Sequence, residues 1–150
     1  MEISVIGGGP IGLIAARALS TDGHQVRLFD PSINKPKMSL ALAESTLRLL
    51  DSIGVELEAG QDLTEILVNE KGLPGSILLH ASECGYPRFG RVVCSKSLEE
   101  AVLLHVSECV ETVAVDTIRA RSAQANPRIQ LATGEEVAPD LVILADGGRS

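Results

Sequence analysis

The stretch "VIGGGPIGLIAARALSTDGHQVRLFDP", residues 5–31, decides the fold. Residues 2–6 form a β-branched apolar run, and residues 24–30 alternate between apolar and polar side chains, so both predict strands. Between them, residues 10–23 predict a helix that ends near Gly23. A strand, a helix and a second strand in this order form a βαβ unit, which favours a parallel sheet. The apolar residues at helical spacing are Ile11, Ile14, Ala15, Ala18 and Leu19.

Three glycines follow the first predicted strand at positions i, i+2 and i+5. Gly7 permits the tight turn out of the strand, Gly9 lets the backbone approach a pyrophosphate, and Gly12 lets the helix pack near the sheet. Pro10 suits the first helical turn, where its missing N–H costs little. The start of this helix is therefore predicted to bind phosphate groups through free N–H groups and the positive end of the helix dipole.

Asp30 ends the second predicted strand, 18 positions after Gly12. A carboxylate there accepts hydrogen bonds from ribose hydroxyls and repels a 2′-phosphate. Glycines alone could mark only a turn, but here the preceding strand, the following helix, the second strand and the terminal acid are all present. The pattern predicts an adenine dinucleotide at these residues, and local physics does not separate FAD from NAD.

The rest of the chain predicts further helices, strands and loops. Residues 31–37 are expected to form a loop, and residues 41–53 a helix that Gly54 ends. Ser95 or Ser97 could cap a second helix over 98–106. Residues 110–123 and 128–132 predict an antiparallel ribbon turned at 124–127, and residues 133–140 predict a turn. The remaining predicted strands are 62–69, 76–80, 91–94 and an apolar, buried strand that starts at 141.

Composition bounds the class of protein. A chain of 150 residues with 45% apolar and 22% charged residues suits one globular domain, and its net charge of −7 argues against nucleic acid as a partner. We find no presequence and no apolar run long enough to span a membrane, so a cytoplasmic protein is expected. Cys84, Cys94 and Cys109 lack CxxC or metal-ligand spacing and are expected to be buried structural thiols, and no metal site is predicted.

The last ten residues, "LVILADGGRS", run from an apolar strand into Asp146 and Gly147. Such a strand end opens onto the ligand crevice of a doubly wound sheet. A plain strand exit, with the Gly-Gly pair as a turn, is the alternative.

Taken together, these stretches resemble the FAD-dependent aromatic hydroxylases of the para-hydroxybenzoate hydroxylase type, and most of all their ubiquinone-biosynthesis branch. The resemblance rests on "VIGGGPIGL", "LALAESTLRLLDSIGV", "RVVCSKSLEEAVL" and "LVILADGGRS". The first motif is shared by many dinucleotide folds, whereas "ADG..S" marks this hydroxylase family. The pair of motifs at this separation indicates FAD.

The resemblance implies a Rossmann-like α/β FAD-binding fold of the glutathione-reductase type, with an antiparallel β ribbon and incomplete at its C-terminus. Residues 1–150 would be the FAD-binding domain, the N-terminal part of a larger monooxygenase. The glycines and the first acid would hold the AMP half of FAD, and Asp146 with Gly147 would lie near its pyrophosphate, a pair also linked to NAD(P)H use. A family arginine near the flavin corresponds to Met38 with Lys37 beside it, and a second corresponds to Lys96; lysine keeps the charge but loses the planar fork.

The activity implied by the resemblance is hydroxylation of a small aromatic ring, such as a quinone precursor, with NAD(P)H and O₂. The cofactor carries this chemistry, so no catalytic side chain is predicted, and the 150 residues alone are expected to be inactive. Peripheral membrane or multi-enzyme association and the oligomeric state stay open. Two alternatives also stay open: an NAD-dependent dehydrogenase domain, and a truncated nucleotide-binding module without turnover.

Overall fold

The computed structural model describes residues 1–150 apart from 31–36, 73, 107–109, 115–117, 124–125 and 148–150. The chain divides into two compact units. Unit 1 comprises residues 1–36 and 99–150, and unit 2 comprises residues 37–98. Most of the loop predicted at 31–37 lies outside the described residues.

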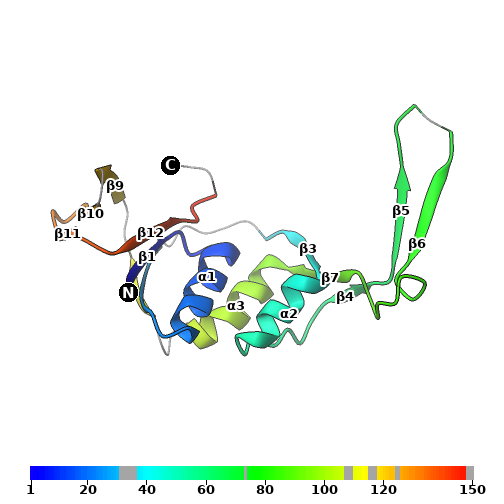
Figure 1. Ribbon diagram of the computed structural model, residues 1–150, viewed down its shortest axis with the longest axis horizontal. Helices are drawn as coiled ribbons and strands as arrows, with labels where there is room; N and C mark the ends of the chain where they lie inside the picture. Colours follow the sequence, from blue (N-terminus) through cyan, green and yellow to red (C-terminus); the bar gives the residue numbers. More distant parts are fainter. Residues whose placement is uncertain (31–36, 73, 107–109, 115–117, 124–125, 148–150) are drawn as a thin grey trace. The chain divides into compact units, whose positions relative to one another are not determined.

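Unit 1 is built on a four-stranded parallel sheet in the order β12–β1–β2–β8. Its strands are β1 (Glu2–Ile6), β2 (Gln25–Asp30), β8 (Glu111–Ala114) and β12 (Leu141–Leu144). Helix α1 (Pro10–Thr21) connects β1 to β2, and Gly23 follows its end with a φ of 84°. The βαβ unit predicted from the opening stretch is confirmed (Figure 1).

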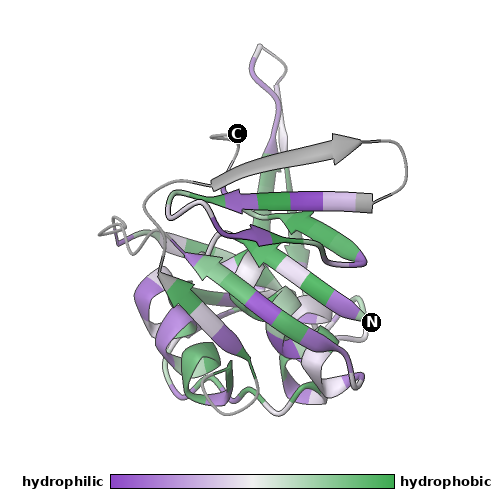
Figure 2. Ribbon diagram, turned by 90° about the vertical axis from the view of Figure 1, so that its left-hand side faces the viewer, coloured by the Kyte–Doolittle hydropathy of each residue, from purple (hydrophilic) through white to green (hydrophobic). Residues whose placement is uncertain are grey.

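Alternate residues of the sheet in unit 1 build two apolar layers. Ile3 and Val5 are buried, as are the helix residues Leu13 and Ala16. On the other face, Phe29 packs with apolar residues of the ribbon formed by β9 (Ile118–Ala123), β10 (Asn126–Leu131) and β11 (Glu136–Val137). Figure 2 shows the resulting alternation of hydrophobic and hydrophilic residues along the strands. The members of this second cluster are Ile6, Phe29, Val113, Ile129, Leu131, Val137 and Val142.

The predicted antiparallel ribbon is confirmed for β9 and β10, which β11 joins as a third strand, but the prediction is wrong for residues 110–114. Those residues form β8, which pairs in parallel with β2, and Arg27 makes a 2.7 Å ion pair with Glu111 across the two strands. The edge of β2 offers unpaired backbone groups, and pairing with it outweighs continuation of the ribbon. Residues 124–125 of the predicted turn lie outside the described residues, and the turn predicted at 133–140 contains the short β11.

Two burial predictions are wrong. Strand β12 is half exposed, with Leu141 42% and Leu144 56% exposed, because it is an edge strand paired only with β1 among the described residues. Cys84 and Cys94 are exposed rather than buried, since the first lies in a turn and the second ends β7 (Gly90–Cys94), next to the buried Val93. Cys109 lies outside the described residues. Across the described helices, none has the length and apolarity needed to cross a membrane.

Unit 2 holds a three-stranded antiparallel sheet in the order β3–β7–β4. The predicted helix over 41–53 begins later, because residues 41–43 belong to β3 and pair with β7, as in Ala41 opposite Val92. Backbone pairing with β7 here overrides the helix propensity of the alanine and leucine residues. Gly54 ends the helix with a φ of 75°, as predicted. The elements are β3 (Ser39–Ala43), α2 (Glu44–Ser52), β4 (Gln61–Leu63) and β7 (Gly90–Cys94).

Strands β5 (Glu65–Asn69) and β6 (Ser76–His80) form a separate two-stranded hairpin. The strand predicted over 62–69 is therefore two strands. Several apolar side chains of the hairpin face solvent, with Leu67 62% and Ile77 63% exposed.

Helix α3 (Ser95–Val106) follows β7 directly and runs from unit 2 into unit 1. The predicted cap by Ser95 or Ser97 is wrong, because both residues lie inside the helix. The buried Ser95 instead accepts a 3.1 Å hydrogen bond at Oγ from the Met38 N–H, and its own N–H donates to the Met38 carbonyl at 2.8 Å.

A chain of charges links the start of α2 to β4 and β7. Arg88 donates from Nε to Glu44 at 2.8 Å and lies 3.4 Å from Asp62, while Arg91 donates from Nε to Asp62 at 2.6 Å. The hydrogen bond from Arg91 lowers the pKa of the Asp62 carboxyl below its ordinary value, and the hydrogen bond to Glu44 raises the pKa of Arg88.

Replacing Asp62 by asparagine is expected to lower the free energy of unfolding at pH 7. It is also expected to reduce the loss of stability between pH 7 and pH 3. A carboxyl whose pKa is lowered on folding stabilises the folded state above the unfolded-state pKa of about 4, and this contribution is lost as the pH falls below that value. Urea unfolding at pH 7 and pH 3 measures the effect. Glu56→Gln, which neutralises an exposed carboxylate of the same unit, is the control. An equal change of unfolding midpoint in both variants would contradict the prediction.

Candidate functional site

Three strand ends of unit 1 meet at one edge of the parallel sheet. Gly7 follows β1 and its N–H donates to the Phe29 carbonyl at 2.8 Å, next to Asp30 at the end of β2. On the other side, the Ala145 N–H donates to the Ile6 carbonyl at 2.7 Å, so β12 delivers Asp146 to the same edge. The carboxyl ends of parallel strands are where such sheets bind ligands. The structure thus brings together the glycine loop, Asp30 and Asp146, which are distant in sequence.

Gly7 and Gly12 are required by packing within this edge. Gly7 has a φ of 106°, and a Cβ there would meet the carbonyl of Ala145, with the Asp146 nitrogen at 2.9 Å. A Cβ at Gly12 would meet the Gly7 carbonyl oxygen and would lie 3.3 Å from the Ala145 Cβ. Both contacts involve backbone, which cannot swing aside as a side chain can. The turn and the close helix packing predicted from the glycine spacing are therefore present.

Gly9 stands in a different environment. It is the N-cap of α1, with φ −74° and ψ 178°, and no described atom lies within 4 Å of a Cβ built there. No described side chain caps the helix, and its first turn carries no acidic residue. Pro10 occupies the first turn, where no intrahelical N–H bond is lost. The helix start is thus an open, electropositive cradle of backbone N–H groups, and it fits a diphosphate.

Asp30 turns its carboxylate toward the glycine loop. The N–H of Gly8 donates to Asp30 Oδ1 at 3.2 Å. A Cβ at Gly8 would collide with this carboxyl group. Gly8 was not predicted as a site residue, although three consecutive glycines, where the motif needs only two, were the available signal.

Asp146 is half-buried and lies two residues after the end of β12, and Gly147 has a φ of 75° that favours glycine. These two residues form a bend next to the glycine loop. Their position agrees with a strand end that opens onto the ligand crevice. The left-handed φ of Gly147 also agrees with the alternative, in which the Gly-Gly pair only forms a turn after the strand.

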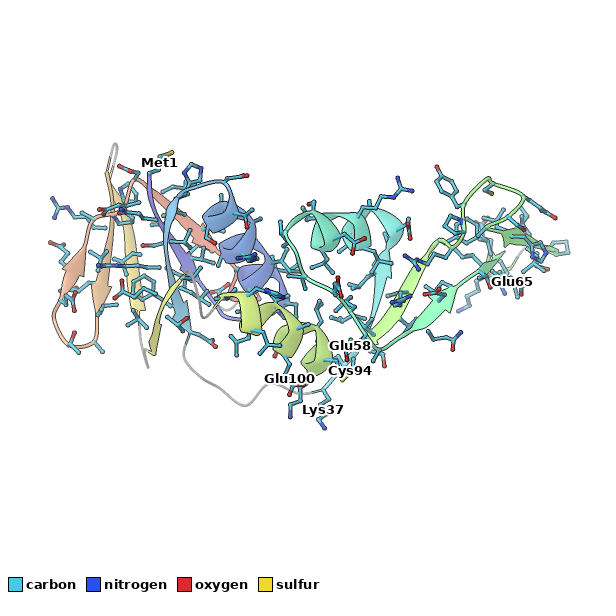
Figure 3. The ribbon with its side chains drawn as sticks, turned by 90° about the horizontal axis from the view of Figure 1, so that it is seen from below. Met1, Lys37, Glu58, Glu65, Cys94 and Glu100 are labelled. Atoms are coloured by element: carbon cyan, nitrogen blue, oxygen red, sulfur yellow. The ribbon has the colours of Figure 1, made fainter. Side chains whose placement is uncertain are left out.

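Lys37 and Lys96 belong to unit 2, whereas the glycine loop, Asp30 and Asp146 belong to unit 1. They flank the paired residues Met38 and Ser95, one step beyond the last β3–β7 pair of Ser39 with Cys94. Both lysines are exposed, and Figure 3 labels Lys37 near Cys94. Two ammonium groups at one end of this ladder suit an anionic group.

A cavity of about 290 Å³ in unit 1 lies elsewhere. Its lining comes from the starts of β1, β2 and β8 and from the segment after β11, so it opens at the amino ends of the strands. The motif residues do not line it. It is therefore not the dinucleotide cradle. Within the described part of the chain, no group of three His, Cys, Asp or Glu residues is placed to hold a metal ion.

Known proteins are similar to this chain in sequence and in fold. The family model described as "FAD binding domain" matches residues 1–150. Hispidin-3-hydroxylase from Neonothopanus nambi is 32% identical over 79 residues, which are 51% of this chain and 19% of that protein. The crystal structure of 2-methyl-3-hydroxypyridine-5-carboxylic acid oxygenase has a TM-score of 0.77 at 25% identity, covering 99% of this chain and 40% of that one. The p-nitrophenol 4-monooxygenase of Pseudomonas putida DLL-E4 shares the fold, with a TM-score of 0.74 at 16% identity over 99% of this chain and 41% of that one.

The chain spans about 40% of the length of these two structures, and its matched segment is 19% of the length of hispidin-3-hydroxylase. The family model, in contrast, covers the whole chain. Together with the open glycine cradle and the acid at the end of β2, this match shows that the chain belongs to the FAD binding domain family.

Proposed function

We propose that this chain is the FAD-binding part of a flavin-dependent monooxygenase that hydroxylates a small aromatic ring with NAD(P)H and O₂. The observation that carries the proposal is the open N-terminus of α1 beside Asp30, in a chain of the FAD binding domain family. The similar hydroxylase, oxygenase and monooxygenase support the reaction class. Because the chain spans less than half of each, the activity concerns the whole protein.

The residues of the cradle would each hold one part of FAD. Gly9 and the N–H groups of the first turn of α1 would receive the pyrophosphate, and Gly7 and Gly12 would keep that turn in place. Asp30 would accept hydrogen bonds from the adenosine ribose, and Asp146 with Gly147 would lie on the pyrophosphate side. Lys37 and Lys96 would bring positive charge to an anionic part of the cofactor. When bound, FAD supplies the electron transfer and the oxygen chemistry.

This chain contributes binding, orientation and exclusion of water, and no side chain is assigned as an acid, base or nucleophile. The carboxylate of Asp30 would repel the 2′-phosphate of NADP but would accept from the ribose of NAD as well as from that of FAD. The proposal therefore assigns FAD to this cradle on the family match, with NAD(P)H as electron donor. The proposal includes a quinone-precursor ring as substrate, residues 1–150 as one FAD-binding domain at the N-terminal side of a larger enzyme, and a cytoplasmic location with peripheral membrane or multi-enzyme association.

Replacing Asp30 by alanine is expected to weaken FAD binding by about 1.5–3 kcal/mol, or roughly 10- to 150-fold in Kd, the range for hydrogen bonds to a charged group. Quenching of FAD fluorescence by the titrated protein measures the Kd. Asp22→Ala is the matched control, because it removes the same charge at the opposite end of α1. Equal FAD affinity in the Asp30 variant and the wild type would contradict the ribose assignment.

The activity is tested on the complete product of the gene. After FAD is supplied, a flavin absorbance band and NAD(P)H consumption with O₂ uptake in the presence of phenolic rings are expected. Tight NADH binding without any FAD binding would instead favour a dehydrogenase domain. FAD binding without NAD(P)H consumption would favour a module without turnover, which is the result expected for the 150 residues alone.

A further inference from the structure

We propose that Gly8 is a positioning residue for Asp30. Gly8 occupies the first variable position of the G-x-G-x-x-G motif, so the motif itself does not require glycine there. In this protein, the missing side chain leaves the space that the Asp30 carboxylate fills. The inference deepens the proposed function and rests on it, since the ribose that Asp30 would bind is the adenosine ribose of FAD.

The hydrogen bond of the Gly8 N–H and the space beside Gly8 both involve Asp30. Gly8 is buried, and its N–H donates to Asp30 Oδ1 at 3.2 Å. The three described atoms nearest to a Cβ built at Gly8 are the carboxyl carbon, Oδ2 and Cβ of Asp30, with the Cβ at 2.8 Å. Gly8 is not among the described glycines with positive φ, so backbone conformation does not demand glycine at this position. Glycine is required at this position because the Asp30 side chain occupies the space that a Cβ would take.

The neighbouring glycines differ from Gly8 in what a side chain would meet. At Gly7 and Gly12 it would meet backbone, and at Gly9 it would meet no described atom within 4 Å. At Gly8 the three nearest atoms all belong to the Asp30 side chain and include its Cβ. An alanine there is expected to displace this side chain from the loop and to break its bond to the Gly8 N–H.

The consequence concerns orientation before the ligand arrives. A carboxylate held by a backbone N–H has already lost part of its rotational freedom in the free protein. The side chain therefore loses less conformational entropy when the ribose binds. A carboxylate can accept at about four lone-pair sites, and the bond from the Gly8 N–H uses only one of them. Gly8 thus acts on the ribose through Asp30 and does not touch it.

Three variants test the inference: Gly8→Ala, Asp30→Gly and the double variant. Asp30→Gly is chosen because the Asp30 Cβ is itself one of the close atoms. The probes are FAD, ADP and 2′-deoxy-ADP, read by calorimetric titration, and the ligand-free melting temperature reports folding. Gly8→Ala is expected to weaken FAD and ADP by about tenfold or more, and to reduce the preference for ADP over 2′-deoxy-ADP toward that of Asp30→Gly.

The double variant is expected to bind like Asp30→Gly alone, because residues that act through one another give non-additive effects. If Gly8→Ala lowers the melting temperature, Asp30→Gly is expected to restore it. A double variant that stays less stable than Asp30→Gly would show that the close neighbour of residue 8 is not Asp30, and would overturn the inference.

The two proposals fail in distinguishable ways. Wild-type affinity and wild-type ribose preference in Gly8→Ala, together with weak binding in Asp30→Gly, would overturn the role of Gly8 and leave the proposed function standing. A wild-type protein that binds neither FAD nor ADP would overturn the proposed function and this inference with it.

Discussion

Replacing Gly9 by valine is expected to abolish FAD binding, with a loss of more than about 100-fold in affinity, while the protein stays folded. The backbone of Gly9 has φ −74° and ψ 178°, an extended conformation that valine adopts readily. No described atom lies within 4 Å of a Cβ at this position, so the new side chain would project into open space at the start of α1. In the proposed complex, the pyrophosphate occupies that space.

Fluorescence titration with FAD and a ligand-free melting curve separate the two effects in the Gly9 variant. Gly9→Ala is the graded control, since one methyl group fills less of the cradle and should cost less affinity than the branched side chain. A valine variant that binds FAD as tightly as the wild type would show that phosphate does not approach Gly9, and the assignment of the cradle would be lost.

Replacing Gly12 by alanine is expected to destabilise the protein by about 3 kcal/mol or more, the upper end of the cost of overpacking. The expected change in the free energy of unfolding is opposite to the change that helix propensity alone predicts. By propensity, alanine stabilises a helix interior by about 1 kcal/mol over glycine. The reason is contact with backbone, because the added Cβ would meet the Gly7 carbonyl oxygen and press on Ala145. Either α1 or the loop after β1 must move.

Denaturant unfolding without cofactor measures the loss in the Gly12 variant. Gly9→Ala again serves as control, because it makes the same substitution at the cap of the same helix and is expected to cost less than about 1 kcal/mol. An unchanged unfolding midpoint in Gly12→Ala would show that the helix can withdraw from the loop without loss, and that close packing does not explain this glycine.

Local patterns predicted the opening of the chain well. The run of residues 10–23 carries both a helical spacing and its stop signals, and α1 ends within two residues of the predicted stop. The predictions failed where pairing with a distant strand competes with local preference. Residues 41–43 have alanine and leucine, which favour helix, yet they pair with β7, and Glu111–Ala114 leave the predicted ribbon for the edge of β2.

The amino-acid sequence by itself determined the βαβ unit, the three motif glycines and the acid at the end of the second strand, because spacing along one chain encodes turns, helix faces and strand ends. Only the tertiary structure decided which glycines serve packing and which face open space, and that Gly8 lies against Asp30. Gly12 is constrained mainly by the Gly7 carbonyl of the same loop, whereas the atoms close to Gly7 and Gly8 belong to Ala145 and Asp30, which the parallel pairing of β12 and β2 with β1 brings to the loop. The contacts of Gly7 and Gly8 join residues far apart in sequence, and no local pattern records them.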